Sequence, residues 1–547
     1  MRPVNQSKDL FRGAFILTIA ALIIKILSAV YRIPFQNIVG DVGFYIYQQI
    51  YPFYGLAVVL TTTGFPVVIS KVYAELKEKG NGINAEKFLL TSYIFLQLFG
   101  IVCFLVLYTG SGQIAIWMND PKLVILLKVV SFVFLLFPFV SVIRGFYQGK
   151  GDMVPTAVSQ VIEQMMRVAT ILLLSFYFTK KGSSPYFVGG AAMFGSITGS
   201  LVSAIILFTF LFIRKEWKMF SQSIKRIGEP SIGSKWILNV LFSQGLAICI
   251  CGMLMIFIQM ADSLNLYSLL VSGGVNAEAA KGLKGVFDRG QPLIQLGTVV
   301  GTSMSLSLVP LISSERLKKN SEFLFHKINL TMKISVVFGV GATAGLMTII
   351  EPTNIMLFKN ASGSSMLGVL CFVILLNTLI STIVAIMQGM GKIGFPAGVT
   401  IMAFPIKYGL NLILVPHFKT MGAALSTVIT LTFICLLLVF KFKKMFSHPI
   451  FTATFFKHVF MATMVMILLL KGVLITTHFL NTGVPSGRLI ASFEAIGSVC
   501  IGGIAFLWIV LRGGIFPEED LALFPFGSKL ALFLRREDRS STYVKKN

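Results

Sequence analysis

The sequence predicts an all-α protein that crosses a membrane many times, and three observations carry this prediction. The chain has 547 residues, of which 55% are hydrophobic and only 13% are charged, and its mean hydropathy is +0.83. The apolar residues form long runs, and lysines and arginines gather in alternate loops between those runs. A soluble domain carries about 25% charged residues, so this chain has too little charge to cover a surface in water. An ordinary soluble enzyme, a disordered chain and a secreted disulfide scaffold are therefore excluded.

About fourteen apolar runs are long enough to cross a bilayer, because a spanning helix needs about 20 residues. The runs lie at 11–34, 45–70, 88–109, 122–143, 154–178, 186–213, 236–260, 286–312, 327–350, 365–387, 397–415, 420–440, 457–478 and 489–511. The first run is too long for a signal peptide and lacks a cleavage site of small residues. We therefore expect it to remain as an uncleaved span.

The net charge of +25 indicates a sided membrane topology and not nucleic-acid binding. If the N-terminus lies in the cytosol, the cytosolic loops hold more than three times as many lysines and arginines as the outer loops. Positive residues accumulate in short cytosolic loops. We therefore expect both termini in the cytosol and no nucleic-acid partner.

The cytosolic tail, residues 512–547, contains the segment LALFPFGSKLALFLRRED, which is apolar and then basic. This pattern favours an amphipathic helix at the membrane surface, in which Lys529, Arg535 and Arg536 meet anionic membrane lipids. A frayed tail is the alternative.

Three short patterns occur twice, in the same order and at nearly the same spacing. They are Gly64-Phe65-Pro66 with Leu308-Val309-Pro310, Gln148-Gly149 with Gln388-Gly389, and Gly190-Ala191-Ala192 with Gly422-Ala423-Ala424. The repetition predicts two six-helix lobes followed by a helix pair, with an N-lobe at 1–215, a cytosolic linker at 216–235, a C-lobe at 236–441 and the final pair at 457–511. Since six is even, the lobes are parallel repeats, and this arrangement predicts a substrate cavity between them near mid-membrane.

The first run carries polar residues on one helical face. Lys25, Ser28 and Arg32 stand at positions i, i+3 and i+7, which share a face of a helix. A charge in the bilayer costs about 2.5–3.5 kcal/mol on insertion scales, so these residues are functional candidates. Two cations and a hydroxyl on one face favour an anion-binding cavity that water reaches. Snorkelling of the side chains to the outer interface is the alternative.

A second pair of candidate cations lies at corresponding places in the two halves. Arg167 falls in the fifth run, and Lys407 falls at nearly the same place in the second half, which favours a shared central site. Glu163 precedes Arg167 by four residues, so the two side chains are able to pair on a helix. Such a pair, or a coupling-ion site at Glu163, is expected.

Three further charges lie around the loop between the seventh and eighth runs. Asp262 follows the seventh run, and Asp288 and Arg289 stand at the start of the eighth. Arg289 is a candidate for the cationic cavity, and Asp288 is a candidate for a coupling-ion site or an ion pair. Plain loop charges are the alternative for all three.

Two groups of residues in the runs are expected to act through packing or anchoring. Small residues four apart favour close helix packing, as at Gly195 with Gly199 and at Gly297 with Gly301. Four tyrosines at the outer end of the second run predict an interfacial aromatic belt, with stacking against sugars as the alternative. These tyrosines are Tyr45, Tyr47, Tyr51 and Tyr54.

The sequence offers no residues for a chemical reaction on a bound group. The six cysteines lie inside apolar runs, the five histidines are scattered, and no metal-ligand spacing occurs. No phosphate-binding or dinucleotide-binding loop is complete. We therefore expect no cofactor, no metal and no enzymatic activity.

The stretch from Arg144 to Arg167, RGFYQGKGDMVPTAVSQVIEQMMR, resembles the signature of a transporter family. It is similar to the polysaccharide-exporter branch of the multidrug/oligosaccharidyl-lipid/polysaccharide (MOP) superfamily, and most similar to the stage V sporulation protein B and lipid II flippase group. The basic opening from Lys25 to Pro34 looks like that group's first helix. Gly64-Phe65-Pro66 and Arg289-Gly290-Gln291-Pro292 also fit the group.

The resemblance implies a flippase in the bacterial cell membrane, with fourteen spans. Its substrate would be an undecaprenyl-pyrophosphate-linked sugar, such as lipid II, moved from the inner to the outer leaflet by alternating access around a cationic cavity. The implied partners are this substrate, membrane lipids, and enzymes of cell-wall or polysaccharide synthesis. The candidate cavity residues are Lys25, Ser28, Arg32, Arg167, Arg289 and Lys407.

Two other functions are kept as alternatives. A cation-coupled multidrug exporter of the same fold would need buried carboxylates for cationic drugs, whereas the spans here hold more lysine and arginine than aspartate and glutamate. A membrane glycosyltransferase or ligase would need a catalytic loop with convergent acidic or histidine residues. No such loop is evident in the sequence.

Overall fold

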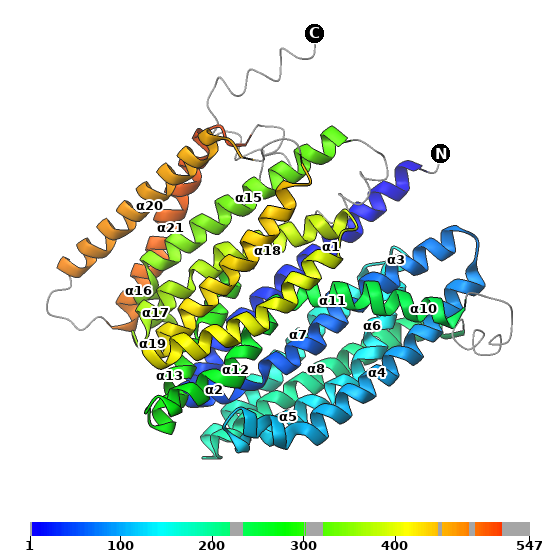
Figure 1. The fold of residues 1–547 in the computed structure, drawn as a ribbon, viewed down its shortest axis with the longest axis horizontal. Helices are drawn as coiled ribbons and strands as arrows, with labels where there is room; N and C mark the ends of the chain where they lie inside the picture. Colours follow the sequence, from blue (N-terminus) through cyan, green and yellow to red (C-terminus); the bar gives the residue numbers. More distant parts are fainter. Residues whose placement is uncertain are drawn as a thin grey trace, which may run out of the picture. The chain divides into compact units, whose positions relative to one another are not determined.

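Helices make up the regular structure of the residues that the structure describes. The computed structural model describes residues 3–218, 233–299, 301, 321–446, 451–480 and 487–516 (Figure 1). These residues contain no β-strand, so the predicted all-α class is confirmed. In hydrocarbon, every backbone N–H and C=O must find its partner within the protein, and a helix provides that partner locally.

Twelve helical stretches of the described chain are long and apolar enough to cross a membrane, which confirms a polytopic membrane protein. Two of them, Ile16–Glu78 and Gly394–Lys443, have 63 and 50 residues, whereas one crossing needs about 20. Each stretch leaves the helical conformation, at Gly40 (φ 70°) and at Lys419 (φ 51°) respectively. Each therefore holds two of the predicted spans.

Close contacts across each break show that the chain reverses direction there. The hydroxyls of Tyr31 and Tyr47, on either side of Gly40, are 2.9 Å apart. A side chain at Gly422 would overlap the carbonyl of Leu414, although eight residues of continuous helix would separate the two by about 12 Å. The predicted run 286–312 is described only as far as residue 301.

The chain divides into two compact units, Met1–Pro292 with Gly391–Thr430, and Leu293–Met390 with Leu431–Asn547. The first unit contains α1 (Pro3–Val30), α2 (Arg32–Val59), α3 (Phe65–Glu78), α4 (Gly82–Trp117), α5 (Val124–Ser131), α6 (Val133–Gly149), α7 (Val154–Lys180), α8 (Pro185–Ile213), α10 (Ser234–Val240), α11 (Leu246–Gly252), α12 (Leu254–Ser272) and α13 (Ala277–Asp288). The second contains α15 (Ser321–Thr348), α16 (Ile350–Phe358), α17 (Ser364–Leu370), α18 (Phe372–Gly389), α20 (Ala453–Leu480) and α21 (Arg488–Arg512). Helix α19 (Gly394–Lys443) begins in the first unit and ends in the second.

The predicted division into repeated lobes at 1–215 and 236–441 stays a prediction. Most of the linker at 216–235 and nearly all of the tail at 512–547 lie outside the described residues. The predicted final helix pair corresponds to α20 and α21, which pack against each other. In the second unit, buried residues such as Val337, Ala462 and Phe506 join this pair to α15 in one hydrophobic cluster.

Glycines bring α8 close to α7 in the first unit. A Cβ atom at Gly195 would lie 3.0 Å from the carbonyl oxygen of Arg167, and one at Gly199 would lie 2.9 Å from that of Glu163. The close packing predicted for this glycine pair is therefore confirmed, as it is in the second unit for Gly297 and Gly301 against α18. The α7 backbone that carries Glu163 and Arg167 is held by this contact. Helices α1 and α2 also pack against α7 (Figure 1).

Gly285 offers a test of the packing of α13 against α2. A Cβ atom at Gly285 would overlap the backbone carbonyl of Asp41, whereas one at Gly282 of the same helix would meet nothing within 4 Å. We expect Gly285→Ala to lower the free energy of unfolding by about 1–3 kcal/mol, as overpacking does. Gly282→Ala, the matched control, should be neutral or slightly stabilising because alanine favours a helix. Thermal unfolding of the purified protein measures both, and equal midpoints would contradict the packing.

Candidate functional site

Arg167 of α7 is buried among tyrosines. Its Nη2 atom donates hydrogen bonds to the hydroxyls of Tyr31 at 3.2 Å and Tyr47 at 2.9 Å. Its Cζ atom lies 4.1 Å from the ring centre of Tyr54. An aromatic ring presents a negative face to a cation, so the charge of Arg167 is met here by uncharged groups.

Arg32, at the start of α2, belongs to the same group of side chains and is only 3% exposed. Its Cζ atom lies 4.5 Å from the ring centre of Tyr51, and the Cζ atom of Arg167 lies 5.6 Å from that centre. Two cations predicted on separate spans therefore share one ring. We call this group the arginine–tyrosine cluster, and it consists of Tyr31, Arg32, Tyr47, Tyr51, Tyr54 and Arg167.

The other two residues of the predicted basic face lie on α1. Ser28 is buried, and Lys25 is half-buried one turn earlier. A snorkelling side chain would reach the membrane surface and remain exposed. The burial of Arg32 and Ser28 shows that snorkelling does not describe these two positions.

The tyrosines of α2 do not form the predicted interfacial belt. Tyr45 and Tyr47 have no exposed surface and Tyr54 has 3%, whereas belt residues would face lipid and water. The Tyr45 hydroxyl donates to Oδ2 of Asp120 at 3.1 Å, and the hydroxyl of Tyr186 donates to the same atom at 2.6 Å. The prediction is wrong because distant segments supply polar partners that let the hydroxyls be buried.

Glu163 pairs with Arg144 of α6, and the predicted pair with Arg167 is wrong. The Nη2 atom of Arg144 lies 2.7 Å from the carboxylate of Glu163 and 2.8 Å from the hydroxyl of Ser203. Its Nη1 atom donates to the carbonyl of Thr61 at 3.1 Å, which lies in a π-helical turn after α2. Arg144 and Arg167 are both buried, but only Arg144 reaches the carboxylate of Glu163, whereas Arg167 binds tyrosine hydroxyls.

Lys407 of α19 is neutralised by Asp262 of α12. Its Nζ atom lies 2.7 Å from Oδ1 of Asp262, and neither side chain is more than 4% exposed. Asn411, one turn after Lys407, donates to the same carboxylate at 2.8 Å. Asp262 is therefore not a plain loop charge, and the charge of Lys407 is balanced locally.

The charges at the end of α13 are also buried and paired. Both carboxylate oxygens of Asp288 accept from the Nζ atom of Lys284, at 3.1 and 2.9 Å. The guanidinium of Arg289 binds both carboxylate oxygens of Asp41, with Nη2 distances of 2.8 and 2.7 Å. The loop-charge alternative is wrong for Asp288 and Arg289, since their exposures are 4% and 0%.

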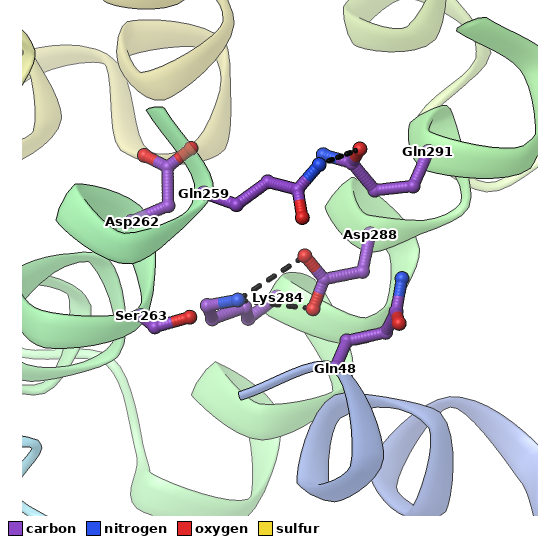
Figure 2. A pocket seen from close by; sticks show the side chains of 7 residues that line it. All are labelled: Gln48, Gln259, Asp262, Ser263, Lys284, Asp288 and Gln291. Atoms are coloured by element: carbon purple, nitrogen blue, oxygen red, sulfur yellow. Dashed lines mark hydrogen bonds and ion pairs between the residues drawn. The ribbon is translucent and has the colours of Figure 1, made fainter. Parts of the chain in front are cut away.

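A small polar pocket lies between α2, α12 and the end of α13 (Figure 2). Its cavity volume of about 10 Å³ has room for about one water molecule, far below the 300–1,000 Å³ typical of sites for drug-sized ligands. Figure 2 shows the Lys284–Asp288 pair on one side and the Gln259–Gln291 hydrogen bond on the other. The lining residues are Gln48, Gln259, Asp262, Ser263, Lys284, Asp288 and Gln291.

Arg167 differs in its partners from the buried cations that bind carboxylates. In the described part of the chain, no carboxylate lies within salt-bridge distance of Arg167, and its Nε atom is buried without a hydrogen bond. The Nε2 atom of Gln164, one turn away, is also buried without a hydrogen bond there. The α7 face of the arginine–tyrosine cluster therefore offers donors and positive charge suited to an anion. Among the same residues, no group of three His, Cys, Asp or Glu side chains is placed to hold a metal ion.

Sequence reasoning missed Arg144, Asp41 and Lys284. Arg144 falls just after the predicted run 122–143, and Lys284 falls just before the predicted run 286–312. One signal for Arg144 was available, because two aromatic residues, Phe146 and Tyr147, follow it closely and extend the run. No local signal pairs Asp41 with Arg289, since 248 residues separate them.

A family model described as "Polysaccharide biosynthesis protein" matches residues 10–316, more than half of the chain. The chain belongs to the polysaccharide biosynthesis protein family. The predicted resemblance is thereby confirmed, and the chain is a multi-pass bacterial membrane protein of this family.

Relatives in Bacillus subtilis (strain 168) align with most of the length of this chain. The chain is 43% identical to the "Uncharacterized membrane protein YabM" over 97% of this chain and 98% of that protein. It is 26% identical to the "Lipid II flippase MurJ" over 77% of this chain and 80% of that protein, and 24% identical to "Stage V sporulation protein B" over 78% and 82%.

Solved structures share the fold of this family member. An inward-facing multidrug resistance MATE family transporter of the MOP superfamily matches with a TM-score of 0.62 and 16% identity, covering 78% of this chain and 97% of that chain. The lipid II flippase MurJ in an inward closed conformation matches with a TM-score of 0.61 and 16% identity, covering 91% and 100%. At these identities the likeness concerns the fold.

The Arg144–Glu163 pair gives a stability prediction. We expect Arg144→Met to lower the free energy of unfolding by about 3–5 kcal/mol, because it leaves a mostly buried carboxylate without its counter-charge. Arg214→Met is the matched control, since Arg214 pairs with Asp152 at an exposed site, and exposed pairs contribute about 0–1 kcal/mol. Thermal unfolding of the purified variants measures the difference. Equal losses would show that the Arg144–Glu163 pair contributes no more than a surface pair.

Proposed function

We propose that this protein is a flippase that moves a saccharide linked to undecaprenyl pyrophosphate from the inner to the outer leaflet of the cell membrane. Support comes from the family, from the 26% identity over 77% of the chain to a lipid II flippase, and from the cluster of buried cations. The proposed step moves a molecule without breaking a bond, so it requires no catalytic residue. Lipid II is one candidate substrate, and enzymes that make lipid-linked precursors are candidate partners.

The arginine–tyrosine cluster is the observation that carries this proposal. Guanidinium groups bind phosphate oxygens through paired hydrogen bonds, and Arg167 holds its charge against neutral partners. A diphosphate that reaches Arg32 and Arg167 would exchange ring faces and hydroxyls for charged oxygens. The tyrosine rings would remain beside it as surfaces against which a sugar stacks.

The cations that already bind a carboxylate are not placed at the centre of the proposed diphosphate site. Arg289 and Lys407 each bind a carboxylate, so a phosphate would have to displace an existing counter-charge at either one. We therefore centre the proposed diphosphate site on Arg32 and Arg167, and extend it along Lys25 and Ser28 of α1. Glu163 and Asp288 serve as partners of Arg144 and Lys284 in this proposal.

The physical task explains why such a site is needed. A saccharide headgroup carries many hydroxyls, and each polar group left unsatisfied in hydrocarbon costs several kcal/mol. A cationic groove would shelter the head while the polyprenyl tail stays in lipid. An inside-negative potential favours outward movement of an anion by about 2.3 kcal/mol per charge per 100 mV.

A multidrug exporter is the second candidate, because the fold is shared with MATE transporters at a TM-score of 0.62. Depletion of the protein separates the two functions. The flippase proposal expects a lipid-linked precursor to accumulate in the cytosolic leaflet with unchanged drug sensitivity. Drug hypersensitivity without precursor accumulation would favour the exporter.

Substitution of Arg167 tests the proposed site directly. We expect Arg167→Gln to lower transport of labelled undecaprenyl-pyrophosphate saccharides in proteoliposomes about 10- to 100-fold, because a hydrogen bond to a charged group contributes about 1.5–3 kcal/mol. Arg167→Lys should lose less, since it keeps the charge but not the paired geometry.

The control for this experiment is Arg214→Gln, which removes an exposed arginine outside the cluster and should leave transport unchanged. Each variant is first compared with the wild type by thermal unfolding. Full transport by a correctly folded Arg167→Gln protein would contradict the proposed site. If the wild type transports one class of lipid-linked saccharide faster than lipid II, that class is the substrate.

A further inference from the structure

The ammonium group of Lys407 sits in a complete shell of oxygen atoms. Its Nζ atom lies 2.7 Å from Oδ1 of Asp262, 2.9 Å from Oδ1 of Asn411, 2.8 Å from the carbonyl oxygen of Ala423 and 2.7 Å from Oγ of Ser426. An ammonium has three hydrogens to donate, so four close oxygens exceed what its hydrogen bonds require. A carboxylate, an amide, a backbone carbonyl and a hydroxyl are the ligand types that hard cations prefer.

The shell is fixed by contacts that do not involve Lys407. The Nδ2 atom of Asn411 donates to Asp262 and to Oδ1 of Asn265, both at 2.8 Å, so the amide oxygen of Asn411 is turned toward the centre. Asn265 in turn donates to the carbonyl of Tyr408 at 3.0 Å. The side chains of Asn411 and Ser426 are completely buried. Oxygens from α12 and from both arms of the α19 hairpin thus face one point.

The net charge of the shell determines whether it suits a monovalent or a divalent cation. Asp262 supplies one negative charge, and the remaining three oxygens are neutral. A monovalent cation makes this buried group neutral, whereas a divalent ion would leave an excess positive charge in a low dielectric, which is costly. We propose that this shell is a monovalent-cation site whose cation is the ammonium of Lys407, carried by the chain itself.

The oxygen shell adjoins the polar pocket. Asp262 also lines the polar pocket, beside Gln259 and Ser263 of the same helix (Figure 2). Removal of the lysine side chain would leave the carboxylate and three oxygens next to that pocket. A free Na⁺ would then bind where the ammonium now lies. This inference is independent of the proposed function, because it concerns ion binding and not the transported molecule.

The test compares Na⁺ binding by the purified full-length wild type and by Lys407→Ala. The wild type should bind no radioactive Na⁺ at Asp262, and its unfolding temperature should be the same in NaCl and in choline chloride at equal ionic strength. Lys407→Ala should bind Na⁺ and gain roughly 1–3 °C for each tenfold rise in Na⁺ above its dissociation constant. The double variant Lys407→Ala with Asp262→Asn should lose this response.

Lys128→Ala is the matched control. Lys128 also lies within an apolar span, but it is exposed and its Nζ atom stacks on the ring of Tyr108 at 5.3 Å. Its removal leaves no oxygen shell, so it should produce no Na⁺ response. A folded Lys407→Ala protein without a Na⁺ response would overturn the proposal.

Measurements on the wild type keep the proposal testable if Lys407→Ala fails to fold. Na⁺ binding or Na⁺ stabilisation in the wild type that disappears in Asp262→Asn would also overturn it, because the shell would then accept an external ion alongside the lysine. The absence of any Asp262-dependent Na⁺ response in the wild type supports the occupied shell.

Discussion

A positive side chain enclosed in a membrane protein must be met by a counter-charge, a ring face or an anion, and this requirement organises the polar interior of the first unit. The Born cost of an unmatched ion is too large for the packing of a few side chains to offset. Carboxylates meet the buried cations in the pairs Arg144–Glu163, Lys407–Asp262, Lys284–Asp288 and Arg289–Asp41. Arg167 is met by tyrosines instead, and the guanidinium of Arg32 also lies over a tyrosine ring. These two arginines carry the proposed anion site.

The same requirement explains the backbone features around these side chains. The helices approach closely where a charge has to be held, as at the glycines of α8 that touch the α7 backbone beside Glu163 and Arg167. The π-helical turn after α2 contains Thr61, whose carbonyl accepts from Arg144. At Lys419 the backbone takes a left-handed conformation, and this reversal brings Ala423 beside Lys407. Each irregularity thus positions a donor or an acceptor.

The spans were predictable because hydropathy is a local property, recorded in about 20 successive residues. A cavity-facing position was also expected for Arg32 from the helical face it shares with Lys25 and Ser28, and for Arg167 from its place within the fifth run. The partners of the buried charges were not predictable, because they are set by contacts between distant segments. The i, i+4 rule assigned Glu163 to Arg167, but Arg144 from the neighbouring helix reaches the carboxylate at 2.7 Å. The belt predicted from Tyr45 and Tyr47 failed for the same reason.

A cation that is part of the chain changes the energetics of any transport cycle. An ion from solution binds with a free energy that depends on its concentration on each side of the membrane, and a transporter draws work from that difference. The ammonium of Lys407 is part of the chain, so its binding does not depend on a concentration on either side of the membrane. Its covalent attachment keeps its local concentration at Asp262 high enough to exclude competing ions. The Asp262 carboxylate is therefore neutralised equally on both sides, and it supplies no work from a Na⁺ gradient. For an anionic cargo, the membrane potential acting on the cargo's own charge remains a source of work that needs no bound ion.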